Sequence, residues 1–263
     1  MIETFATKQK PLALVLDVEA SAPCELAFTG YDAEQVSNGY FSRRVGHKEP
    51  FTGRNRLVFP MPLTPNRLRV RITASTGVVV MHGYEFAPLQ KADESLTTAD
   101  RDFVAFAQWL AVHMPQLPPT RPERFPYQSA GGRYMAVLSE RILNSDGSEN
   151  STPARISRST GIAQLSKHLM VPHTVPMRLM ILLHEYNHYK LNSTDESECD
   201  LAAVAIFCAL GYSAIEGLYA FAKVLDDSPD KPQLRERVGR VLDALLAYQA
   251  REPRYTAYLN PNG

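Results

Sequence analysis

Two histidines four residues apart, His184 and His188, follow a long apolar segment, and this combination strongly constrains the fold. Thr174 is a favoured N-cap residue, and Pro176 is compatible with the first turn of a helix. No proline or glycine follows before residue 190, so the sequence predicts a helix over about 175–190. Residues four apart lie on one helical face, about 6 Å apart, and two imidazoles placed in this way can bind one small cation.

Glu185 stands next to the first of these histidines, at the glutamate position of the pattern His-Glu-x-x-His. In zinc hydrolases the histidines of this pattern bind the metal, and the glutamate carboxylate accepts a proton from the attacking water. Tyr186 and Asn187 complete the pattern and are uncharged, as a buried metal-binding helix requires. The alternative is a pair of ordinary histidines on an amphipathic helix, with their nitrogens satisfied by backbone carbonyls.

A zinc site needs a third protein ligand, and an acidic segment follows the histidines. If a second helix begins near Glu196, then Glu196 and Asp200 share one face, so one carboxylate can bind metal while the other orients a histidine. Glu198 and Asp200 are the alternative ligands. The same segment also fits capping boxes, which pair Ser193 with Glu196 and Asp195 with Glu198 and stabilise a helix start without any metal.

This arrangement resembles that of the gluzincin metallopeptidases, in which His-Glu-x-x-His precedes a helix with the pattern Glu-x-x-x-Asp. The resemblance covers about 175–210 and has a short gap of seven residues between His188 and Glu196. It implies one Zn²⁺ per chain, bound by His184, His188 and Glu196. It further implies that Glu185 is the general base and that Asp200 orients a histidine ligand. The implied activity is zinc-dependent hydrolysis of peptide bonds in a protein or peptide substrate.

The rest of the C-terminal half is predicted to be mainly helical. Residues 201–210 are apolar on every side, which is typical of a buried helix, and Gly211 would end it. A third helix is predicted from Ser213 to about residue 226, and a fourth begins near Pro232. Tyr212 and Tyr219 are candidates for donating a hydrogen bond to an oxyanion, although tyrosines on such helices usually serve in packing.

Short segments between 133 and 170 alternate with period two and predict a small sheet that leads into the helix of the two histidines. In the zincin folds that the resemblance implies, an edge strand beside the cleft binds the substrate backbone by strand addition. The segment 160–166 is the candidate for this edge strand.

The first ninety or so residues predict a separate domain, 1–92, built as an antiparallel β-sandwich. Segment 67–74 alternates strictly, and its arginines either form the solvated face of a half-buried sheet or bind an acidic ligand. A binding or docking role is the default, because active-site residue types are missing here. Residues 93–126 form a helix and a proline-rich linker, and 127–263 a zincin-like domain, so the expected fold class is α+β.

Composition limits the remaining possibilities. The chain has 28 basic and 28 acidic residues, so no general charge excess favours nucleic acid. No signal peptide or membrane-spanning segment is expected, which suggests a cytoplasmic or particle-associated protein without membrane partners. Three cysteines are too few for a disulfide framework. The second functional hypothesis is a structural or assembly component, for example of a virus particle or secretion device, with assembly partners bound through the N-terminal domain.

Overall fold

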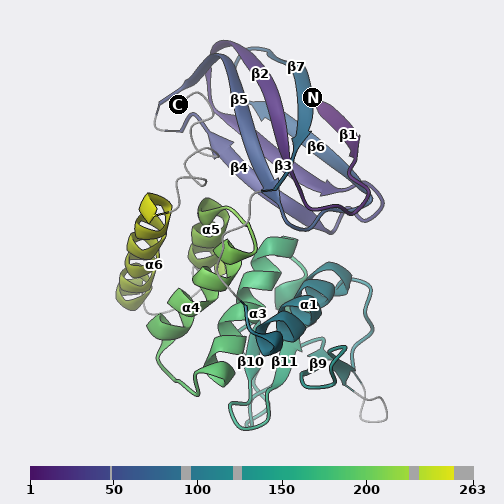
Figure 1. The fold of residues 1–263 in the computed structure, drawn as a ribbon, viewed down its shortest axis with the longest axis vertical. Helices are drawn as coiled ribbons and strands as arrows, with labels where there is room; N and C mark the ends of the chain where they lie inside the picture. Colours follow the sequence, from purple (N-terminus) through teal and green to yellow (C-terminus); the bar gives the residue numbers. More distant parts are fainter. Residues whose placement is uncertain (48, 90–95, 121–125, 225–230, 252–263) are drawn as a thin grey trace. The chain divides into compact units, whose positions relative to one another are not determined.

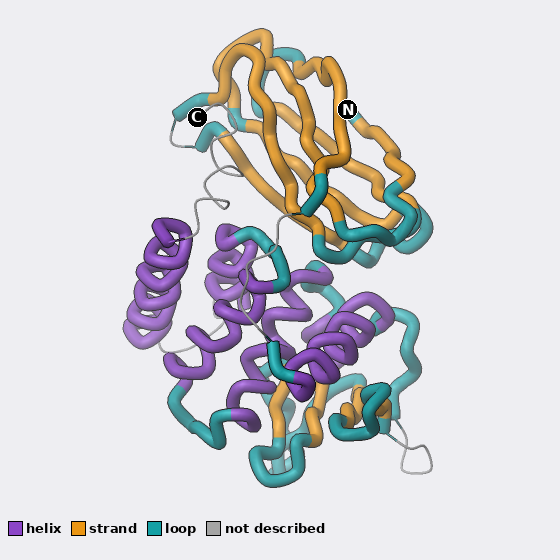
Figure 2. Tube along the Cα trace, viewed as in Figure 1, coloured by secondary structure: helices purple, strands orange, loops and turns teal. Residues whose placement is uncertain are grey.

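The computed structural model describes residues 1–47, 49–89, 96–120, 126–224 and 231–251. Within these ranges the chain contains both helices and strands, as expected from the sequence, with six helices, two antiparallel sheets and one mixed sheet. It divides into two compact units. The first contains Met1–Ala92, and the second contains Asp93–Ala209 and Ala214–Leu245. Figure 2 distinguishes the strands of the first unit from the helices that dominate the second.

Two antiparallel sheets make up the first unit (Figure 1). One sheet has the order β1-β6-β3-β4, and the other has the order β5-β2-β7. Their strands are β1 (Ile2–Ala6), β2 (Leu12–Cys24), β3 (Leu26–Asp32), β4 (Gly39–Val45), β5 (Phe51–Met61), β6 (Arg67–Ala74) and β7 (Val79–Ala87). Strands β1 and β4 lie in segments where the sequence had indicated no strand, because neither segment contains a long alternating apolar run.

Aromatic side chains join the two sheets of this unit. Phe59 of β5 stacks on Phe41 of β4, with ring centroids 4.6 Å apart, and it also contacts Phe28 of β3 at 5.3 Å. All three rings are buried. On β6 the apolar residues between the arginines face this core, whereas Arg67 and Arg71 are exposed. The strict alternation of β6 is therefore the pattern of a sheet that is buried on one face only.

The second unit is organised around α3 (Val175–Lys190), which has the bounds that the sequence predicts. The side chain of Thr174 accepts a hydrogen bond from the Met177 amide, and proline stands in the first turn. Helix α1 (Thr98–His113) packs on α3 and begins at a capping box formed by Thr97 and Asp100. The helix that the sequence placed in the linking segment 93–126 thus belongs to the second unit.

A small mixed sheet of order β10-β11-β9-β8 accompanies these helices. It contains β8 (Tyr127–Gln128), β9 (Met135–Ser139), β10 (Ala154–Ile156) and β11 (Ile162–Ser166). Our prediction that segment 160–166 forms the edge strand is wrong. Strand β11 pairs with β9 on one side and with β10 on the other, because the turn at 157–161 folds β10 back antiparallel to it. The edge strand next to α3 is β10, whose contacts with this helix fix its position.

The remaining helices are α2 (Lys167–Met170), α4 (Glu196–Ala209), α5 (Ala214–Val224) and α6 (Lys231–Arg251). Gly211 follows α4 with a φ of +92°, a backbone conformation that favours glycine and ends the helix. The end predicted for the third helix, near residue 226, lies outside the described residues. In the part of the chain that is described, no helix combines the length and apolar character needed to cross a membrane.

Candidate metal centre

The apolar first half of α3 holds the helix in the core and thereby positions the polar residues of its second half. Leu179, Leu182 and Leu183 are almost completely buried. Arg178 is fully buried as well, and its guanidinium donates hydrogen bonds to the backbone carbonyls of Met170, Val171 and Ala111. These carbonyls lie at or near the C-terminal ends of α2 and α1, where helices leave carbonyls without intrahelical partners. Arg178 therefore locks the start of α3 against both helices.

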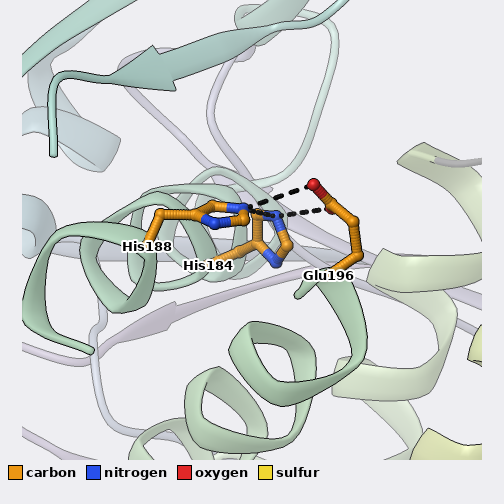
Figure 3. Close-up of side chains that lie close together, drawn as sticks. All are labelled: His184, His188 and Glu196. Atoms are coloured by element: carbon orange, nitrogen blue, oxygen red, sulfur yellow. Dashed lines mark hydrogen bonds and ion pairs between the residues drawn. The ribbon is translucent and has the colours of Figure 1, made fainter. Parts of the chain in front are cut away.

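The two histidines of α3 and the first residue of α4 converge (Figure 3). The Nε2 atoms of His184 and His188 are 3.0 Å apart. One carboxylate oxygen of Glu196 lies 3.3 Å from Nε2 of His184, and the other lies 3.5 Å from Nε2 of His188. Bond lengths of 2.0–2.1 Å at tetrahedral angles put zinc ligand atoms about 3.3 Å apart. The three side chains thus have the chemistry and the spacing of a zinc ligand set.

Both imidazoles have an oxygen atom close to Nδ1, the ring nitrogen that does not face the converging group. Nδ1 of His188 lies 2.9 Å from the carbonyl oxygen of Ser193, in the turn that joins α3 to α4. Nδ1 of His184 lies 2.8 Å from a carboxylate oxygen of Asp200, which is 1% exposed. A hydrogen-bond acceptor at Nδ1 leaves Nε2 as the nitrogen that can bind a metal, and this arrangement is common around metal-binding histidines. Asn192 has a φ of +48° in this turn, which closes the short gap between the helices.

Carboxylates surround His184 and favour a positive charge there. Burial by itself lowers the pKa of His184, but hydrogen bonds to Asp200 and Glu196, together with the negative charges of Asp200 and Glu185, outweigh burial and raise this pKa to about 9. The pKa of Glu196 is lowered to about 2, mainly by its hydrogen bond to His184. A position that stabilises a proton so strongly also attracts a metal cation, which replaces the proton when it binds.

Glu185 lies in a different environment from Glu196. Burial and the nearby charge of Glu196 raise the pKa of Glu185 to about 7, against the opposing effects of His184 and of a hydrogen bond from the Ile156 amide. A carboxylate with a pKa near neutrality can both accept and return a proton at physiological pH. The Ile156 amide belongs to β10, so the edge strand and this carboxylate are in direct contact.

A buried polar network fixes the last turns of α3 against α1. Asp100 is 2% exposed and accepts hydrogen bonds from the Tyr186 hydroxyl at 2.9 Å, from Lys190 at 2.7 Å and from Thr97. Burial by itself raises the pKa of Asp100, but these hydrogen bonds outweigh it and lower the pKa to about 2. The ring of Tyr186 also stacks on Phe103, with centroids 4.1 Å apart. Tyr186 therefore faces away from the ligand set and anchors the helix.

The structure separates the acidic candidates of the sequence by role. Glu196 joins the two histidines, and Asp200 contacts His184 from behind. Asp195 caps α4 by accepting hydrogen bonds from the amides of Ser197 and Glu198, so capping explains this residue without a metal. Glu198 is exposed and is not part of the converging group.

The two tyrosines proposed as oxyanion donors lie in different environments. Tyr212 is 2% exposed, as expected of a packing residue, and Tyr219 is 46% exposed on α5.

Sequence reasoning missed Arg237, which lies on α6 and reaches the centre. Its guanidinium donates two hydrogen bonds to Asp200, at 2.8 and 2.9 Å, and lies 3.0 Å from a carboxylate oxygen of Glu196. The helical spacing of the sequence could have indicated this role. Arg237 is three residues after Leu234 and four before Val241, and thus lies on the apolar face of the predicted helix. Arginine on such a face needs a buried acidic partner.

Cys199 is a second neighbour that the sequence analysis did not place. Its Sγ atom is 3.3 Å from Nδ1 of His188, which is the nitrogen directed away from the converging group. Burial and the surrounding carboxylates raise the pKa of Cys199 to about 12, so without a metal the thiol stays protonated at neutral pH.

Comparison with known proteins found no matching family model, curated protein or solved structure.

Proposed function

We propose that the protein is a zinc-dependent metallopeptidase of the gluzincin type, with a zincin-like second unit. One observation carries this proposal: two Nε2 atoms and a glutamate carboxylate converge within 3.0–3.5 Å, and a second glutamate, Glu185, adjoins His184 on the same helix. Structural zinc sites usually have four protein ligands, whereas three leave a position open for chemistry. The donor set of two imidazoles and one carboxylate is typical of catalytic zinc.

In this proposal His184, His188 and Glu196 hold one Zn²⁺. Bound zinc would polarise the scissile carbonyl and make water more acidic. Glu185, which adjoins His184 on α3, takes the proton of the attacking water and returns it to the leaving amine. Asp200 keeps His184 in the orientation that directs Nε2 to the metal.

Strand β10 is the element that we propose for binding the substrate backbone. It is an edge strand, and the amide of Ile156 is directed to Glu185 rather than into the sheet. An extended peptide added along this edge would bring its backbone next to the general base. The expected substrate is therefore an unfolded segment or a loop of a protein, since only an extended chain can add as a strand.

Replacement of Glu185 by glutamine tests the proposal. Glu185→Gln removes the base but none of the three ligands, so the variant should bind one zinc per chain as the wild type does and lose nearly all turnover. The measurements are elemental analysis of protein purified without added metal and cleavage of a mixture of denatured proteins, read by mass spectrometry. The matched control is Glu198→Gln. Glu198 lies two residues after Glu196 on α4 and is exposed, so this variant should cleave at the wild-type rate.

Two results contradict the proposal. If the wild-type protein stays folded but binds no zinc, the assignment of the metal centre is refuted. If Glu185→Gln cleaves the substrate at the wild-type rate, the assignment of Glu185 as the general base is refuted.

The second candidate function is an assembly component that docks through the first unit. Its support is a set of exposed apolar side chains on β7, which is an edge strand in the described sheet: Val80 is 47%, Tyr84 is 55% and Phe86 is 41% exposed. Exposed apolar edges of this kind tend to bind other chains. Light scattering of the purified chain distinguishes the candidates, since an assembly component should self-associate and lose this property in Tyr84→Ser and Phe86→Ser variants.

A further inference from the structure

Helix α6 contributes a cation to the centre, and this cation contacts two carboxylates at once. Nε and Nη2 of Arg237 bind the two oxygens of Asp200 in a bidentate pair, and Nη2 also lies 3.0 Å from Glu196. The side chain of Arg237 is 14% exposed and that of Asp200 is 1% exposed. A bidentate pair fixes the plane of the carboxylate as well as its distance. Arg237 therefore determines which oxygen Asp200 presents to His184.

The charge balance of the centre gives this contact its importance. A histidine must be neutral to bind a metal, so His184 in the loaded centre offers Asp200 a hydrogen bond without a positive charge. Among the described residues, Arg237 is then the remaining cation in contact with Asp200. A buried carboxylate without a charged partner is strongly destabilised.

We infer that Arg237 is a positioning residue of the metal centre, which acts through Asp200 and Glu196 and makes zinc retention depend on α6. This inference rests on the proposed metal centre, and it adds a fourth element to the two helices and one strand that carry the other residues. Loss of residues that orient metal ligands typically weakens metal binding about 10- to 100-fold. We expect an effect of this size on the zinc dissociation constant when Arg237 is replaced.

The experiment compares Arg237→Met with Arg240→Met on the same helix. Arg240 is half exposed and pairs with Glu236, so its replacement is a matched loss of one arginine outside the centre. Zinc affinity is measured by competition with a chromogenic chelator, and unfolding of the metal-free protein by urea. Arg237→Met should raise the zinc dissociation constant about 10- to 100-fold, and Arg240→Met should leave it within about twofold. Arg237→Lys should restore part of the affinity, because lysine supplies the charge without the bidentate geometry.

A merely structural role gives a different result. If Arg237 only attaches α6 to α4, Arg237→Met lowers the stability of the metal-free protein and leaves the zinc affinity of the folded protein unchanged, which overturns the inference. A double-mutant cycle adds a second check. In an Asp200→Asn background, the effect of Arg237→Met on zinc affinity should shrink to a few fold, and full additivity of the two changes also overturns the inference.

If Arg237→Met does not fold, Arg237→Lys and the cycle built with lysine carry the test. Failure of the proposed function is distinguishable from failure of this inference. Wild-type protein without zinc affinity refutes the metal centre itself, whereas normal zinc binding by both wild type and Arg237→Met refutes only the role of Arg237.

Discussion

Replacement of Asp100 by asparagine tests how the helix that carries the two histidines is held in place. The side chain is 2% exposed and accepts hydrogen bonds from Tyr186, Lys190 and Thr97. Its pKa falls from 3.8 to about 2 in the folded chain. At about 1.36 kcal/mol per pKa unit, this shift corresponds to about 2.5 kcal/mol of folding free energy. Asparagine has a similar shape but no charge, so Asp100→Asn should destabilise the second unit by about 2–3 kcal/mol at neutral pH.

The pH dependence has a definite sign. Because the pKa of Asp100 is lowered on folding, its contribution is fully present above the unfolded value of 3.8 and is lost as the pH falls through about 2. The stability difference between wild type and variant should therefore be constant down to about pH 5 and fall to roughly half near pH 3.

Urea unfolding followed by the helical circular-dichroism signal measures this difference at each pH. Glu236→Gln serves as the control, since its exposed pair with Arg240 should contribute less than about 1 kcal/mol. A stability difference that does not change between neutral pH and pH 3 would refute the assignment of a charge-based contribution to Asp100.

Two further outcomes follow from the same contacts. Arg178→Met should destabilise the second unit by about 3–5 kcal/mol in urea unfolding, because three backbone carbonyls lose their buried charged donor; a loss below about 1 kcal/mol would show that water can replace the guanidinium. Glu196→Ala should weaken zinc binding far more than Glu198→Ala in a chelator competition, and the reverse order would assign the third ligand to Glu198.

Local sequence signals were sufficient to predict the helix of the candidate centre. Thr174, Pro176 and the long run without helix breakers fix the bounds of α3, since capping and the restricted φ of proline act within one turn of the chain. The spacing of His184 and His188 then places both rings on one face. The turn at 191–195, which brings Glu196 to them, is also local, and Asn192 adopts a left-handed conformation in it.

The small sheet shows where local signals end. Period-two alternation indicated the strands near β9, β10 and β11, but it did not determine their order. The sequence alone made segment 160–166 an edge strand, whereas pairing places it between two neighbours. Strand order depends on contacts between residues far apart in the chain, and the alternation of residues within one strand does not show which strand pairs with it.

What the sequence by itself determined is the set of candidate residues: two histidines and a glutamate on two consecutive helices that could hold a metal ion, with a second glutamate, Glu185, beside the first histidine. Only the tertiary structure decided the environment of these residues. Arg237 is 37 residues from Asp200, and Asp100 is 90 residues from Lys190, yet each pair is in direct contact. Capping and helical period act over a few residues and can be read along the chain. The charges and burial that set the pKa of Glu185 and His184 come from elements packed together in three dimensions, so they appear only after the chain has folded.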